Sequence, residues 1–126
     1  MQELYEAVRR VRREKKKPVV ALVGDMAASG GYYVAMGCDL VIAHPGSLLG
    51  SIGVIFNSMN FTDLMAKVGV RAEPIKSGKL KDIGSPTRPM TKEERDLLQG
   101  IIDDAYSQFL QAVADGRRRP AEEVKP

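Results

Sequence analysis

The sequence contains one cysteine, one histidine and no tryptophan among its 126 residues. A single cysteine, Cys38, forms no disulfide within the chain and excludes a zinc site built from several cysteines. The single histidine, His44, leaves little for metal binding by imidazole groups, so no metal is expected. No apolar run reaches the roughly 18 residues that a membrane-spanning helix needs, and the first residues lack the apolar core of a signal peptide. The chain itself is therefore expected to be soluble.

Positive charge is concentrated near the start of the chain. The net charge is +3, but residues 9–17 hold seven Lys and Arg against one Glu, so the remainder is net negative. Such a run can bind nucleic acid or an anionic lipid surface, although it is more often a solvated helix face. No aromatic side chains alternate with these charges to stack on bases, so no nucleic-acid partner is expected.

Apolar periodicity predicts helices that alternate with strands. Strands are predicted at residues 19–23, 40–43, 52–56 and 72–76, and helices at residues 2–14, 32–36, 61–68 and 91–114. The run at 19–23 is unbroken, which is typical of a strand buried on both faces of a parallel sheet. The alternation indicates the α/β class, in one domain over residues 1–126 with a frayed tail from 116 to 126.

The boundaries of the longest helix and of the loop before it follow from local signals. Thr91 and Glu94 have the spacing of a capping box, and apolar residues at helical spacing follow them. Residues 77–89 contain two Gly and two Pro between polar side chains, so a loop is predicted there.

Ser29 is the first candidate for chemistry. It stands among small residues, after a strand and at the predicted start of a helix. Unpaired N–H groups at a helix start can stabilise a developing oxyanion, as a serine nucleophile requires. The G-x-S-x-G pattern of such a turn is absent, and a small serine in a packed turn remains the alternative.

A serine nucleophile needs a base, and the residues alone leave the choice open. His44 stands in a His-Pro-Gly turn and is more simply a turn residue. A lysine can serve if burial lowers its pKa toward neutrality, and Lys76, Lys79 and Lys81 lie in or beside the predicted loop. The pattern of a phosphate-binding loop is absent, because no Lys follows the glycine-rich stretches at the required spacing.

Two segments resemble motifs of the bacterial signal peptide peptidase (protease IV, SppA) family. Residues 24–35, GDMAASGGYYVA, resemble its serine motif, and residues 77–86, SGKLKDIGSP, resemble its lysine motif. Residues 46–54 and 90–94 are similar as well. The resemblance runs from about residue 5 to residue 115.

This resemblance implies a serine peptidase with a Ser/Lys dyad on the ClpP/crotonase-type α/β fold, with a mainly parallel sheet and a long C-terminal helix. Ser29 aligns with the nucleophile and Lys81 with the general base, whereas Lys79 does not occupy the matching position. The N–H of Gly30 would be one oxyanion donor, and Ser51 is a candidate for orienting Lys81. No cofactor is implied.

The resemblance also implies peptide substrates, namely signal-peptide remnants and other unfolded apolar segments. It implies a homo-oligomer in which, in single-domain members, the Ser and Lys meet between neighbouring subunits. A full-length member would be anchored in the cell membrane and act at its extracytoplasmic face. Family members carry further strands and a glycine-rich turn upstream, so the chain is expected to be the C-terminal part of such a domain.

Two alternatives to the peptidase remain open from the sequence. A crotonase-type acyl-CoA enzyme would share the fold, although no motif for CoA is recognised. A non-catalytic scaffold or nucleic-acid module would rest on the basic run at residues 9–17.

Overall fold

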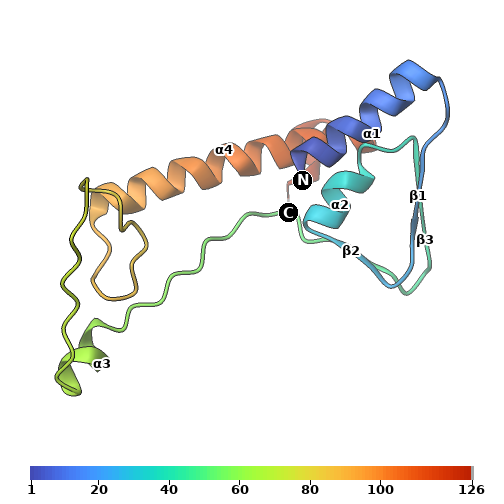
Figure 1. Ribbon diagram of the computed structural model, residues 1–126. Helices are drawn as coiled ribbons and strands as arrows, with labels where there is room; N and C mark the ends of the chain where they lie inside the picture. Colours follow the sequence, from blue (N-terminus) through green and yellow to red (C-terminus); the bar gives the residue numbers. More distant parts are fainter. Residues whose placement is uncertain (126) are drawn as a thin grey trace. The chain divides into compact units, whose positions relative to one another are not determined.

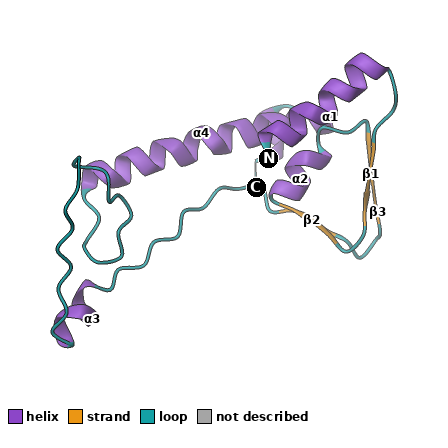
Figure 2. Cartoon of the chain, in the orientation of Figure 1, coloured by secondary structure: helices purple, strands orange, loops and turns teal. Residues whose placement is uncertain are grey.

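The computed structural model describes residues 1–125, which form a mixed α/β structure with parallel strands and a long C-terminal helix. Figure 1 labels the elements along the chain except β4 and α5, and Figure 2 separates helices, strands and loops. In chain order they are α1 (Gln2–Lys15), β1 (Val20–Val23), β2 (Met26–Ala28), α2 (Gly30–Ala35), β3 (Leu40–Ala43), β4 (Leu48–Gly50), α3 (Thr62–Lys67), α4 (Lys92–Arg117) and α5 (Ala121–Val124).

The chain divides into two compact units. The first unit comprises Met1–Val54 and Ala105–Pro126, and the second comprises Ile55–Asp104. Helix α4 contributes its first part to the second unit and its last part to the first. The organisation of residues 1–126 as one domain stays a prediction.

The strands of the first unit form two separate parallel pairs. β1 pairs with β3, with Val20 opposite Leu40. β2 pairs with β4, with Ala28 opposite Gly50. The predicted strand at 40–43 and the predicted strand at 19–23 are confirmed as β3 and β1, whereas the short strands β2 and β4 were not predicted.

The core of the first unit is aromatic and lies where α1, α2 and the end of α4 meet. The ring of Tyr33 in α2 makes edge contacts with Tyr5 of α1 and Phe109 of α4, at centroid distances of 5.1 and 5.0 Å. Val113 of α4 is completely buried, at 0% exposure. At the end of the chain, where the sequence predicts a frayed tail, α5 places Val124 in this core at 4% exposure.

One glycine of α4 is explained by this packing. A Cβ atom at Gly116 would lie 2.7 Å from the carbonyl oxygen of Met36, which is too close for any side chain. The end of α4 can therefore approach the end of α2 because position 116 has no side chain.

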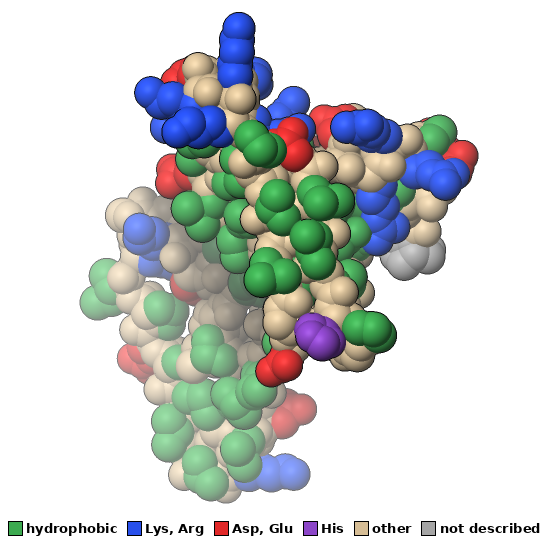
Figure 3. All heavy atoms as spheres, turned by 90° about the vertical axis from the view of Figure 1, so that its right-hand side faces the viewer, with side chains coloured by type: hydrophobic (Ala, Val, Ile, Leu, Met, Phe, Trp, Pro, Cys, Tyr) green, Lys and Arg blue, Asp and Glu red, His purple; other side chains and the backbone are tan. Residues whose placement is uncertain are grey.

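The faces of the β1–β3 pair are largely open. Leu22 is 80% exposed, and Leu40 and Ile42 are exposed as well. Figure 3 shows apolar side chains gathered on the face of the molecule turned toward the viewer. The prediction that the first strand is buried on both faces is wrong, because Val20 and Leu22 of β1 are 49% and 80% exposed.

The second unit contains mostly loops and turns. The predicted helix at 61–68 is confirmed as α3, but residues 52–56 and 72–76, predicted as strands, are not strands in the structure. A β-strand exists only with a hydrogen-bonded partner, and neither segment has one among the described residues. Among the helices of residues 1–125, none combines the length and apolar character that crossing a membrane requires.

The capping box at the start of α4 is confirmed. The N–H of Glu94 donates to the Thr91 hydroxyl at 3.2 Å, and the Thr91 N–H donates to the Glu94 carboxylate at 2.8 Å. These reciprocal bonds satisfy two backbone donors at the start of the helix and fix where the preceding loop joins it.

Candidate active site

Ser29 lies in a strained turn between β2 and α2. Its backbone has φ 49° and ψ −118°, a conformation that non-glycine residues rarely adopt. Its N–H donates to the carbonyl oxygen of Gly50 at 2.8 Å, and its own carbonyl accepts from the N–H of Tyr33 at 2.9 Å. Within residues 1–125 the hydroxyl makes no capping bond to α2, and the residue is exposed. A strained strand-to-helix turn of this kind presents the serine nucleophile in α/β hydrolases.

Ser51 occupies the corresponding position after β4. Ala28 and Gly50 are paired as the last residues of two parallel strands, so Ser29 and Ser51 follow them at the same edge of the sheet. Ser51 also has a left-handed backbone, with φ 54°. The structure therefore brings these two predicted site residues to neighbouring positions.

Gly30 is the first residue of α2, so its N–H has no acceptor within the helix. A side chain at this position would collide with the side chain of Met1. The Met1 side chain is flexible and 66% exposed, so it can move aside and this contact does not by itself require glycine. The role of Gly30 as an oxyanion donor stays a prediction.

The three candidate lysines belong to the second unit and differ in their partners. Lys76 Nζ donates to the Asp82 carboxylate at 2.6 Å, and Lys79 forms an ion pair with Glu93. Lys81 is exposed and, within residues 1–125, forms no ion pair. Ser29 and Ser51 share the first unit, whereas Lys81 belongs to the second.

His44 is part of a turn in the first unit. Its backbone N–H donates to the Ser47 hydroxyl at 3.0 Å, and that hydroxyl in turn donates to the carbonyl oxygen of Gly24. These contacts explain the His-Pro-Gly sequence as a turn signal. Among the described residues, no three His, Cys, Asp or Glu side chains gather in a way that could hold a metal ion.

Part of the basic run has structural partners. Arg12 forms an ion pair with Asp39 at 2.7 Å and donates to the carbonyl oxygen of Gly37 at 2.7 Å. Arg9 lies 3.7 Å from the Asp115 carboxylate. At least these two side chains of the run therefore connect α1 to other parts of the first unit.

The loop that follows Lys81 is fixed by ion pairs centred on Arg88. The guanidinium binds the Asp82 carboxylate in a bidentate manner, with Nε to Oδ2 at 2.8 Å and Nη2 to Oδ1 at 2.8 Å. It also binds Glu94, with Nη1 to Oε2 at 2.8 Å. Glu94 is 2% exposed. We call Lys76, Asp82, Arg88 and Glu94 the Arg88 cluster.

Sequence reasoning did not identify this cluster. The capping box marked Glu94, but an Arg six residues before it and six residues after Asp82 carries no pattern that predicts the pairing. The hydrogen bonds from Arg88 hold the pKa of the Asp82 carboxyl well below its usual range and lower the pKa of Glu94 to about 2. The two carboxylates in turn raise the pKa of Arg88.

Acidification is expected to release this loop from α4. The folded-state pKa of Glu94, about 2, lies below the value of roughly 4.3 for an unfolded glutamate. Its ionised form therefore stabilises the fold above about pH 4.3, and this contribution is lost as the pH falls toward 2. The Thr91 amide donates to this carboxylate, so its NMR chemical shift should report the transition.

Two variants test the assignment of that transition. Glu94→Gln should remove the acid-dependent change of the Thr91 amide shift. Glu93→Gln alters only the exposed pair with Lys79 and should leave the transition in place. A Thr91 shift that stays constant down to pH 2 in the unmodified chain would contradict the role given to Glu94.

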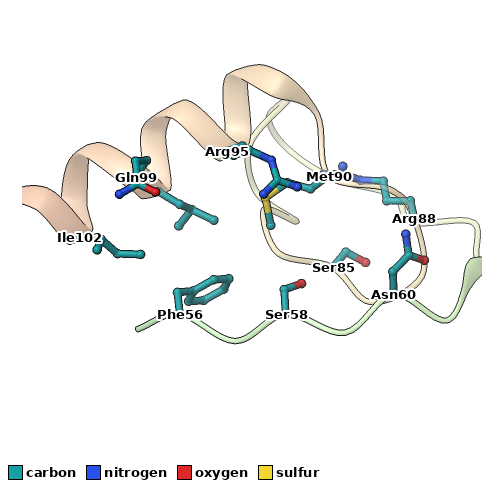
Figure 4. A pocket seen from close by; sticks show the side chains of 10 residues that line it. Phe56, Ser58, Asn60, Ser85, Arg88, Met90, Arg95, Gln99 and Ile102 are labelled. Carbon is teal, nitrogen blue, oxygen red and sulfur yellow. The ribbon is translucent and has the colours of Figure 1, made fainter. Parts of the chain in front are cut away.

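A pocket of about 290 Å³ lies beside the Arg88 cluster, entirely within the second unit. Figure 4 shows Phe56, Ser58 and Asn60 along one side, with Arg95 and Gln99 of α4 opposite them. The lining combines apolar side chains with hydroxyl, amide and guanidinium groups.

The chain is similar to known proteases along nearly its whole length. The model of peptidase family S49 matches residues 11–126. A candidate protease of Synechocystis is 46% identical over 124 residues, covering 98% of this chain and 44% of that protein. A candidate protease of Methanocaldococcus jannaschii is 48% identical over 103 residues, covering 82% of this chain and 33% of that protein. The chloroplastic serine protease SPPA of Arabidopsis thaliana is 36% identical over 110 residues, covering 86% of this chain and 16% of that protein. The chain thus spans less than half the length of each of these relatives.

Proposed function

Because the chain belongs to peptidase family S49, whose relatives include serine proteases, we propose that it carries a Ser/Lys dyad, with Ser29 the nucleophile and Lys81 the general base. The observation that carries this proposal is the strained turn at Ser29, an exposed serine held between a strand and a helix. We further assign the parallel strands and the long helix α4 to a ClpP/crotonase-type fold.

The proposed chemistry is acyl transfer through the serine. Neutral Lys81 Nζ accepts the proton of Ser29 Oγ as Oγ bonds to the peptide carbonyl carbon. The carbonyl oxygen becomes an oxyanion, to which the Gly30 N–H donates. Collapse breaks the C–N bond, and the Lys81 ammonium returns its proton to the leaving amine. Water then cleaves the acyl ester by the same route, and the Ser51 hydroxyl orients Lys81 in both steps.

Peptides are the proposed substrates, in particular signal-peptide remnants and other unfolded apolar segments. The neighbours of Ser29, Ala28 and Gly30, are small, so an extended peptide backbone can approach the hydroxyl closely. This environment supports cleavage beside small or apolar residues.

The full-length protein is proposed to be a homo-oligomer that acts at the extracytoplasmic face of the cell membrane, where its relatives of the signal peptide peptidase type would meet such substrates. The open apolar faces of β1 and β3, with Leu22 80% exposed, support burial against further protein, because contiguous apolar patches commonly mark interaction surfaces.

Labelling at the serine tests the nucleophile directly. We expect a peptidyl probe that acylates serine to add one acyl group per chain, seen by intact mass and located at Ser29 by peptide mapping. Ser29→Ala should give no adduct, while Ser58→Ala, which removes another exposed serine, should label as the unmodified chain does. An adduct that persists in Ser29→Ala, or none on the unmodified chain, would contradict the proposal.

A further inference from the structure

We propose that Arg88 is a positioning residue that keeps the Asp82 carboxylate away from Lys81, so that the neighbouring lysine is free to act as a base. This inference rests on the proposed function of Lys81 and adds a residue that the dyad itself does not contain. It concerns the second unit alone, where Lys81, Asp82 and Arg88 all lie.

The first step is the position of Asp82. It directly follows Lys81 in the chain, so its carboxylate is the nearest acidic group in sequence to the proposed base. An opposite charge within about 4–6 Å favours the protonated form of an amine. A free carboxylate at position 82 would therefore oppose the loss of a proton from Lys81.

The second step is that both oxygens of this carboxylate are already bound. Oδ2 accepts from Arg88 Nε at 2.8 Å, and Oδ1 accepts from Arg88 Nη2 at 2.8 Å and from Lys76 Nζ at 2.6 Å. The side chain of Asp82 is only 16% exposed. A bidentate guanidinium fixes the plane of a carboxylate as well as its place, so Asp82 is held in a defined orientation.

The third step is that Arg88 is itself held from the other side. Glu94 binds the same guanidinium, and its capping bond with Thr91 attaches it to the start of α4. Nη1 also donates to the carbonyl oxygen of Pro89 at 3.1 Å. With its donors used on two carboxylates, Arg88 links the segment after Lys81 to a long helix.

The charges of the cluster balance as long as Arg88 is present. Lys76 and Arg88 are the cations that face Asp82, and Asp82 and Glu94 are the anions that face Arg88. Lys79, the other charged side chain beside Lys81, pairs outside the cluster with Glu93. Loss of Arg88 would leave two carboxylates facing one cation, Lys76, and would free Oδ2 of Asp82, the residue next to Lys81.

The pH dependence of Ser29 acylation tests this inference. Arg88→Gln should move the pH of half-maximal acylation upward by about one pH unit, at the low end of the effect of a nearby charge. The double variant Arg88→Gln with Asp82→Asn should return this pH toward that of the unmodified chain, whereas Arg88→Gln with Glu94→Gln should not. A purely structural role for Arg88 predicts no difference between the two double variants. Arg88→Lys, which restores the charge without the bidentate geometry, should reverse the change only in part.

A second readout needs no catalytic activity. The side-chain NMR resonances of Lys81, in a chain labelled with ¹³C-lysine and assigned by Lys81→Gln, should titrate at higher pH in Arg88→Gln than in the unmodified chain. Arg95→Gln is the matched control, because this nearby arginine forms no ion pair among the described residues. If Arg88→Gln fails to fold, Asp82→Asn alone keeps the Arg88–Glu94 link and should move the Lys81 titration to lower pH.

The outcomes separate this inference from the proposed function. An equal Lys81 titration midpoint in Arg88→Gln and the unmodified chain, or an upward movement in Asp82→Asn, would overturn the role of Arg88. If the Lys81 titration midpoints move as expected but the probe never acylates Ser29, the dyad is rejected and the electrostatic effect of Arg88 on Lys81 stands.

Discussion

Replacing Lys81 by glutamine is expected to slow the acylation of Ser29 by roughly 10²–10⁴-fold, the typical contribution of a general base. A serine hydroxyl is a weak nucleophile until a base accepts its proton. Glutamine keeps much of the length and polarity of the side chain but accepts no proton at neutral pH. The rate of adduct formation, followed by intact mass at a fixed probe concentration, measures the effect.

Lys79→Gln is the matched control for this change. Lys79 lies two residues before Lys81 and its ion pair with Glu93 is exposed, with side-chain exposures of 74% and 56%. Exposed pairs contribute little to stability, so the acylation rate should stay within about twofold of that of the unmodified chain. An equal loss of rate in both variants would show that the total positive charge of the loop matters and would reject Lys81 as the specific base.

Phe109→Ala is expected to destabilise the first unit by about 3–5 kcal/mol, the usual cost of removing a buried aromatic ring. Phe109 is 5% exposed and its ring contacts Tyr33, which in turn contacts Tyr5. Removal of the ring leaves a cavity in the core where helices α1, α2 and α4 meet. Because the chain has no tryptophan, tyrosine fluorescence during urea unfolding reports directly on this core.

Ile101→Ala is the control on the same helix. Ile101 is 57% exposed, so its truncation should change the free energy of unfolding by less than about 0.5 kcal/mol. Equal destabilisation by both variants would mean that the aromatic cluster is not the core of this unit.

The elements that the sequence predicted well are those whose signals are local. The capping box of Thr91 and Glu94 depends on residues three apart, and the structure has both of its hydrogen bonds. The strand at 40–43 is a short apolar run ended by a turn, and β3 has the same bounds. Helix α1 likewise follows from one apolar face along residues 2–14.

The errors concern strands that depend on distant partners. Residues 52–56 and 72–76 have strand-like composition, yet pairing needs a neighbour that composition does not supply. β2 and β4 consist of three residues each, too few for an alternation of apolar and polar side chains to be recognised. The exposure of Leu22 could not be foreseen, because an apolar run shows what a strand prefers to contact and not whether that contact is present.

The candidate site was predictable only in part. Ser29 could be singled out from its small neighbours, but its positive φ has no sequence signal. The proximity of Ser51 arises from the pairing of Ala28 with Gly50, which links residues 22 positions apart. The choice of Lys81 over Lys76 and Lys79 came from the family resemblance and stays a prediction. It is consistent with the ion pairs that occupy the other two lysines.

The left-handed backbones of Ser29 and Ser51 lower the stability of the fold, while the two residues supply hydroxyl groups to the proposed site. Each such conformation costs on the order of 1–3 kcal/mol for a residue with a side chain, whereas glycine adopts positive φ without that penalty. The free energy of unfolding of a domain is typically only about 5–15 kcal/mol, so the strain at two serines is large in comparison. Variants chosen only for heat resistance would therefore drift toward glycine at positions 29 and 51, and would lose both hydroxyl groups of the proposed site in becoming more robust.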